Sequence, residues 1–174
     1  DILAFGAHPD DVELSCAGTI AKEIASGKKI GIVDLTRGEL GTRGSAEIRD
    51  QEAKKAASLL GVVCRENLGF RDGFFINDED HQIAVIEMIR KYKPKTVLCN
   101  AQTDRHIDHG RAAALVHDAC FLSGLQKTIQ RLIEIFSTSK ISTLAILVPD
   151  NALRLLSPKS FAFNTFVLLK ISRS

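Results

Sequence analysis

The fold of this chain is indicated first by the stretch "ILAFGAHPDDVE" at residues 2–13. Residues 2–7 are a short apolar run that ends in turn chemistry, which predicts a buried strand. One imidazole, a proline and three carboxylates follow directly. Because charged groups are costly to bury in a core, we expect this strand to end at the rim of a crevice.

Strand and helix patterns then alternate along the chain. Apolar runs predict further buried strands at residues 29–35, 62–68 and 95–100. Capped or amphipathic segments predict helices at residues 11–26, 46–60, 80–94 and 110–125. This alternation is typical of a doubly wound sheet. We therefore expect one α/β domain with a Rossmann-like, mostly parallel sheet and helices on both faces, and an atypical or truncated C-terminal part.

Polar loops follow three of the predicted strands, at residues 8–13, 36–45 and 101–109. The carboxyl ends of parallel strands meet at one edge of a sheet, where such folds bind ligands. The glycine-rich loop 36–45 is also unusually long for a connection in this class, which indicates a functional role. We expect the three loops to form one site.

The spacing of the charged residues indicates metal chemistry. If a helix begins at the proline, His8 and Asp11 face one point, while Asp10 is rotated by about 100° and stays free. His106 and His109 repeat the same spacing. Two histidines and one carboxylate with an open position are a known format for catalytic zinc. A free Asp10 could then deprotonate water, and a remaining histidine could stabilise an oxyanion or protonate an amine.

A receiver-type module is an alternative, because an acidic pair after the first strand also holds magnesium in receiver domains. That alternative requires an aspartate at the end of the third strand and a lysine near the end of a fifth. Here the third strand runs into "ENLGF", and no fifth strand is evident. The histidines favour zinc, because magnesium prefers oxygen ligands.

The motif "AHPDD", with "HIDH" at residues 106–109, resembles the LmbE/PIG-L superfamily of zinc-dependent N-acetylglucosaminyl deacetylases. The segments "DLTRGELGTRGSAEIRDQEAKKAASLLGV" and "NLGFRDGFF" are most similar to the branch that deacetylates N-acetylglucosaminyl-malate in bacillithiol biosynthesis. The resemblance covers residues 1 to about 126. It departs from the usual pattern at Ile107, where the family commonly has proline. It implies a hydrolase that uses zinc, with ferrous iron as an alternative metal.

The resemblance implies a role for each matching residue near the metal. His8, Asp11 and His109 would be the metal ligands, and Asp10 would be the general base. Arg49, in "EIRDQEA", matches a family arginine that pairs with the base. Such a guanidinium would hold Asp10 ionised and oriented. From the helix pattern alone, Arg49 is expected to be a solvated residue.

Further residues would act on the substrate. By resemblance, His106 is the electrophile or acid, with Asp108 as its charge partner. Candidate substrate contacts are Arg37, Arg43, Arg71 and Asp72. A guanidinium fork suits the carboxylates of malate, although simple solvation is the alternative for the loop arginines.

The overall composition bears on partners and location. The formal net charge of +2 is too small to indicate nucleic acid or an anionic membrane as a partner. We expect a small-molecule N-acetylglucosaminide substrate, no nucleic acid and no membrane, and leave open a homo-oligomer. The four cysteines are widely spaced, which predicts free thiols in a reducing compartment. With no signal-like N-terminus and no apolar stretch long enough to span a bilayer, we expect a cytoplasmic protein.

The last 48 residues do not continue the pattern. Residues 1–126 hold 16 Lys/Arg and 19 Asp/Glu, whereas residues 127–174 hold 7 and 2. We therefore expect a deacetylase-like core at 1–126 and a divergent tail at 127–174. Our hypothesis is that the tail is an out-of-frame or otherwise aberrant continuation of a longer enzyme, and a natural short variant is the competing account. The chain is then either an active enzyme or a metal-binding, catalytically impaired remnant.

Overall fold

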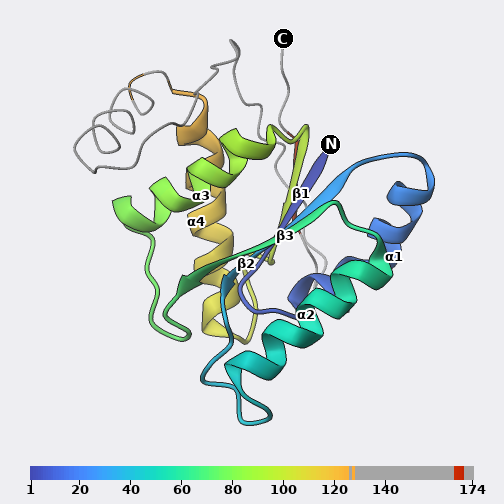
Figure 1. Cartoon of the computed structure of the whole chain (residues 1–174). Helices are drawn as coiled ribbons and strands as arrows, with labels where there is room; N and C mark the ends of the chain where they lie inside the picture. Colours follow the sequence, from blue (N-terminus) through green and yellow to red (C-terminus); the bar gives the residue numbers. More distant parts are fainter. Residues whose placement is uncertain (126, 128–166, 171–174) are drawn as a thin grey trace, which may run out of the picture.

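The computed structural model describes residues 1–125, 127 and 167–170. Within these residues, five strands form one sheet in the order β3-β2-β1-β4-β5 (Figure 1). Their bounds are β1 (Ile2–Gly6), β2 (Ile30–Thr36), β3 (Cys64–Phe70), β4 (Thr96–Cys99) and β5 (Val167–Lys170). Strands β1 to β4 are parallel, and β5 pairs with β4 in the antiparallel direction. The predicted mostly parallel sheet is therefore confirmed.

Helices cover both faces of the sheet (Figure 1). Their bounds are α1 (Asp11–Ala25), α2 (Ala46–Leu60), α3 (Glu79–Tyr92) and α4 (Ile107–Ser123). Successive side chains of a strand point to opposite faces, and β1 shows the result. Leu3 and Phe5 belong to the core cluster that includes α3 and α4 residues, whereas Ala4 belongs to the cluster that includes α1 residues. The predicted α/β sandwich of three layers is thus present.

The strand order positions the site. β1 lies between β2 and β4, so the order of the chain reverses between β1 and β4. Ligands of such sheets bind outside the carboxyl ends of the strands at this switch point. A receiver domain has the order 2-1-3-4-5 instead, and the observed order therefore excludes the receiver alternative.

The start of α4 differs from the prediction. The loop was expected to run to residue 109, but α4 begins at Ile107 with His106 as its N-cap. The His106 ring Nδ1 accepts the backbone N–H of Asp108 at 3.3 Å. Histidine lies outside the usual N-cap residues, so the sequence carries no signal for this start. As a consequence, Asp108 and His109 lie in the first turn of a helix.

The sequence shows no clear fifth strand, but the structure contains one. β5 pairs residue by residue with β4, from Thr96 opposite Lys170 to Cys99 opposite Val167. The place of β5 in the sheet is set by this pairing with β4, which lies far away in the sequence and which a local pattern does not show. Most of the predicted tail at 127–174 lies outside the described residues, so its division from the core stays a prediction.

The cysteine prediction can be checked directly. All four cysteines are free, and three are buried while Cys64 is half-buried. Burial raises the pKa of the Cys99 thiol to about 12, which makes it unreactive at neutral pH. Among the helices in the described part of the chain, none is long and apolar enough to cross a membrane.

Candidate active site

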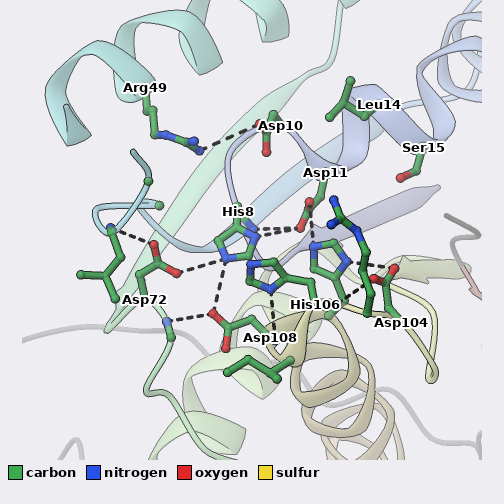
Figure 2. A pocket seen from close by; sticks show the side chains of 17 residues that line it. His8, Asp10, Asp11, Leu14, Ser15, Arg49, Asp72, Asp104, His106 and Asp108 are labelled. Carbon is green, nitrogen blue, oxygen red and sulfur yellow. Dashed lines mark hydrogen bonds and ion pairs between the residues drawn. The ribbon is translucent and has the colours of Figure 1, made fainter. Parts of the chain in front are cut away.

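A pocket of about 650 Å³ opens at the carboxyl ends of the strands (Figure 2). Eight of the eleven predicted site residues line it: His8, Asp10, Asp11, Arg49, Asp72, His106, Asp108 and His109. They come from the loops after β1, β3 and β4 and from the first turns of α1, α2 and α4. The structure therefore brings together residues from both ends of the predicted core.

Asp11 lies at the centre of this cluster and is buried. Its Oδ2 accepts the backbone N–H of His8 at 3.0 Å and the side-chain amide of Asn100 at 3.1 Å. Its Oδ1 lies 3.1 Å from His109 Nε2, and its Oδ2 lies 3.5 Å from His8 Nδ1. Burial alone would raise the pKa of Asp11, but the hydrogen bonds from His109 and His8 hold it well below its usual range. Asp11 is thus an ionised carboxylate between two imidazoles.

The histidines are surrounded by further carboxylates. His8 Nε2 lies 3.1 Å from Asp72 and 3.4 Å from Asp108 (Figure 2). Although burial opposes the shift, Asp11 and then the charges of Asp72 and Asp108 raise the pKa of His8 to about 9. This excess of negative charge in a buried position favours a bound cation.

Two sets of atoms in the described residues are spaced closely enough to hold a metal ion. One is the three histidines His8, His106 and His109, and the other is His8 with Asp72 and Asp108. Within each set the ligand atoms lie within 4.8 Å of one another. The predicted set of His8, Asp11 and His109 shares two histidines with the first of these. Mixed imidazole and carboxylate donors suit zinc or ferrous iron better than magnesium.

Asp10 and Arg49 face each other beside this cluster. Asp10 is the N-cap residue of α1, but its side chain makes no capping hydrogen bond and is 51% exposed. Arg49 Nη1 lies 3.9 Å from its carboxylate. Arg49 extends from α2 past two glycines of the loop after β2. A Cβ at Gly38 or Gly41 would lie 2.7 or 2.8 Å from its guanidinium. The structure therefore places Arg49 in the pocket, and the expectation of a solvated helix residue is wrong.

Asp108 was expected to contact the His106 ring through its carboxylate, but the structure shows a contact through its backbone. Only the backbone N–H of Asp108 contacts the His106 ring. The buried Asp108 carboxylate accepts the Gly73 N–H at 2.8 Å and contacts Arg111 at 3.1 Å. The pairing of its charge with His106 stays a prediction. Because Nδ1 of His106 accepts a hydrogen bond, the neutral ring carries its proton on Nε2 and can donate it.

Three predicted substrate contacts lie away from the described pocket lining. Arg37 donates to Asp50, with a shortest distance of 2.6 Å, and to Glu47 at 3.3 Å. Arg71 stacks over the ring of Phe74 at 4.4 Å. Arg43 is exposed in the loop after β2. Asp72, the fourth candidate, is buried against His8 rather than open to a substrate.

Sequence reasoning missed three polar residues of the site. Asn100, at the end of β4, accepts the Ala7 N–H at 3.0 Å and donates to Asp11. Asp104 lies 3.1 Å from His109 Nδ1. Arg105 lines the pocket, and its side chain has no hydrogen bond or ion pair among the described residues. Their only sequence signal is their position in or beside the polar loop after the fourth strand.

The chain is similar to several curated deacetylases. It is 34% identical over 114 residues to the uncharacterized deacetylase YaiS of Escherichia coli, covering 62% of this chain and 61% of that protein. It is 31% identical over 134 residues to the diacetylchitobiose deacetylase of Thermococcus kodakarensis, covering 71% and 50%. It is 35% identical over 81 residues to a probable N-acetyl-alpha-D-glucosaminyl L-malate deacetylase 2 of Bacillus anthracis, covering 41% and 36%. The chain thus spans less than two thirds of each relative.

Solved structures share the fold. The conserved protein TT1542 of Thermus thermophilus is 41% identical with a TM-score of 0.71, over 74% of this chain and 58% of that one. The N,N'-diacetylchitobiose deacetylase of Pyrococcus horikoshii is 28% identical with a TM-score of 0.71, over 77% and 54%. The 4-carboxy-2-hydroxymuconate hydratase GalB of Pseudomonas putida is 25% identical with a TM-score of 0.68, over 74% and 58%. This last likeness is a reminder that a fold alone does not determine a reaction.

A family model agrees with the motifs and the geometry. The PIG-L model, described as GlcNAc-PI de-N-acetylase, matches residues 3–120, which include most of β1, all of β2 to β4, the pocket and most of α4. The chain therefore belongs to the PIG-L family.

Proposed function

We propose that this chain is a metal-dependent hydrolase that removes the acetyl group from an N-acetylglucosaminyl conjugate. The observation that carries the proposal is the geometry of one pocket. There, the carboxylate of Asp10 faces Arg49 beside a cluster of three histidines and the buried carboxylates of Asp11, Asp72 and Asp108. Deacetylases among the relatives support the same class of reaction.

We propose zinc as the metal, with ferrous iron as the alternative, and His8, Asp11 and His109 as its ligands. The contacts of Asp11 with both histidine rings support this set over the other combinations. A divalent cation held there supplies Lewis-acid chemistry, since it polarises a carbonyl and makes water more nucleophilic at neutral pH.

We assign the proton transfers of the reaction to Asp10 and His106. Asp10 takes a proton from the attacking water, and Arg49, whose Nη1 lies 3.9 Å from its carboxylate, orients it for this step. The water oxygen bonds to the acetyl carbon, and His106 donates from Nε2 to the developing oxyanion. When the C–N bond breaks, the amine takes up the proton removed from water and acetate leaves. Asp108 fixes the first turn of α4 through Gly73 and Arg111.

We propose N-acetylglucosaminyl-malate as the substrate, a role in bacillithiol biosynthesis and a cytoplasmic location. The similarity to the probable malate-conjugate deacetylase of Bacillus anthracis supports this choice. Arg105 supports it as well, because its guanidinium lies at the pocket and is available to a carboxylate. Contacts from Arg37 and Arg43 remain predictions.

A metal-binding but catalytically impaired remnant is the second candidate. It is favoured by the loss of acidic residues after residue 126, in a segment that lies beyond the family match at residues 3–120. In that case the core at 1–126 would keep the metal site, and the divergent tail at 127–174 would fail to complete the substrate wall.

One experiment separates these candidates. The purified chain is analysed for bound metal and incubated with N-acetylglucosaminyl-malate, and the released amine is measured. About one metal ion per chain with amine release supports the enzyme. Metal without turnover on this compound, N-acetylglucosamine or diacetylchitobiose supports the remnant. Absence of metal binding overturns both.

A further inference from the structure

The two histidines beside Asp11 share one feature that the proposed mechanism does not use. Each has its second ring nitrogen against a carboxylate from a different loop. His8 Nε2 lies 3.1 Å from Asp72 Oδ1, in the loop after β3. His109 Nδ1 lies 3.1 Å from Asp104 Oδ2, in the loop after β4. Asp11 therefore sits between two imidazoles whose outer nitrogens are both held.

We propose that Asp72 and Asp104 are positioning residues that select the tautomers of the two metal histidines. An ionised carboxylate only accepts hydrogen bonds, so the ring nitrogen that faces it carries the hydrogen. A metal would replace the hydrogen that the other nitrogen donates to Asp11, and that nitrogen of the neutral ring would then offer its lone pair to the ion. This arrangement presents His8 Nδ1 and His109 Nε2, the two atoms that face Asp11, to the metal. The inference rests on the proposed ligand set.

Each positioning carboxylate is itself held in place. Asp72 is only 6% exposed, its Oδ2 accepts the Leu40 N–H at 3.0 Å, and its own N–H donates to Glu39 at 2.8 Å. Asp104 accepts the His106 N–H at 2.9 Å through Oδ1. Carboxylates restrained by backbone donors fix the orientation of an imidazole and strengthen it as a ligand. Asp72 also connects the glycine-rich loop after β2 to His8.

The alternative is that Asp72 and Asp108 are themselves ligands, together with His8 Nε2. The contacts of Asp108 argue against this. Its carboxylate already accepts the Gly73 N–H and contacts the cationic Arg111. A guanidinium at that distance opposes a second cation on the same carboxylate. The geometry therefore favours an orienting role for Asp72.

The test compares zinc affinity, measured by competition with a chromophoric chelator, in Asp72→Asn and Asp104→Asn. Loss of either carboxylate should weaken zinc binding by about 10- to 100-fold. The matched control is Asp118→Asn, because Asp118 contacts His117 at the same 3.1 Å distance outside the pocket. Its zinc affinity should equal that of the unaltered chain. Zinc affinity that is unchanged in both pocket variants overturns the proposal.

A second readout needs no variant and therefore does not depend on folding of the mutants. Long-range ¹H–¹⁵N spectra of the zinc-loaded chain identify which nitrogen of each histidine carries a proton. We expect protons on His8 Nε2 and His109 Nδ1. A metal on either of these nitrogens refutes the inference. Both measurements omit substrate, so a chain that shows this pattern but releases no amine refutes only the proposed function.

Discussion

The guanidinium of Arg49 reaches to 3.9 Å from the carboxylate of Asp10 through space left by Gly38 and Gly41. Arg49 belongs to α2, Asp10 is the N-cap residue of α1, and the two glycines lie in the loop between β2 and α2. A side chain at either glycine would contact the guanidinium directly. The glycine-rich loop therefore has a steric role in the site, in addition to any contact that its arginines make with a substrate.

Gly41→Ala should displace Arg49 without unfolding the chain. The new Cβ would lie 2.8 Å from Nη2, and the end of a long side chain can move away from it. We expect kcat to fall about tenfold, which corresponds to about 1.4 kcal/mol of transition-state stabilisation, with zinc affinity unchanged. The control is Gly18→Ala, because a Cβ there meets no atom within 4 Å. Equal activity of the two variants would contradict the steric role.

Asp10→Asn should abolish proton abstraction while leaving the metal in place. The amide cannot accept the proton of the attacking water, so turnover should fall by about 10²- to 10⁴-fold. Metal analysis should still give about one ion per chain. Asp118→Asn is the control, since Asp118 pairs with His117 outside the pocket lining. A parallel loss of metal in Asp10→Asn would make Asp10 a ligand instead of a base.

His106→Gln and His109→Gln should separate the two roles of the histidines. The three rings are close, with centroids 4.8 Å apart for His8 and His106 and 4.9 Å apart for His106 and His109. If His106 is the proton donor, its variant keeps the metal and loses turnover. The His109 variant should lose both. The measurement is metal content beside initial rate, and loss of metal in His106→Gln would favour the three-histidine set.

Local signals in the sequence were enough to predict part of the fold. Both ends of α2 were predicted correctly, because Ser45 caps its start and Gly61 adopts the left-handed conformation at its end. The start of α4 after its N-cap His106 was missed because histidine is an unusual cap. The edge strand β5 was missed because its place depends on pairing with the distant β4. The start of α4 and the position of β5 depend on contacts between parts of the chain that are distant in sequence.

In the candidate site, too, some residues could be predicted from local sequence patterns and others depend on tertiary contacts. The motif spacing indicated His8 and Asp11 together with the pair His106 and His109, and the family resemblance selected His109 as the ligand. The structure brings His8 and His109 together around Asp11. Asp104 and Asn100 were missed, since their roles depend on hydrogen bonds across loops that no spacing encodes. The resemblance to a family, rather than the helix pattern, indicated Arg49.

Arg105→Ala tests whether the pocket recognises an anionic aglycone. Removing a cation that contacts malate should raise KM for N-acetylglucosaminyl-malate by about tenfold, in line with about 1–2 kcal/mol for a charge-assisted hydrogen bond. KM for N-acetylglucosamine should not change, because that sugar lacks the carboxylates. Arg37→Ala is the comparison, since the Arg37 guanidinium is engaged by Asp50. A KM effect confined to Arg37→Ala would restore the loop arginine as the malate contact.

The buried ion pair of Asp34 and Arg65 supports the sheet beneath the site. Arg65 donates to Asp34 at 2.7 and 2.9 Å, and it also contacts Glu13 on α1. Arg65→Met should lower the free energy of unfolding by about 3–5 kcal/mol, because Asp34 becomes a buried charge without its partner. Adding Asp34→Asn should recover much of this loss. Urea titrations of the two variants at pH 7 measure both effects.

The pH dependence of Asp34 gives a further test of this pair. Burial raises the pKa of Asp34 to about 6 even though the Arg65 hydrogen bonds oppose the shift, compared with about 3.9 in an unfolded chain. The folded state therefore binds more protons than the unfolded state between these values. The stability contributed by this group is present below about pH 4 and is lost as pH rises through 6. Arg65→Met removes the opposing hydrogen bonds, so its stability deficit should be larger at pH 8 than at pH 5. A deficit independent of pH would mean that Arg65 does not hold the pKa of Asp34 down.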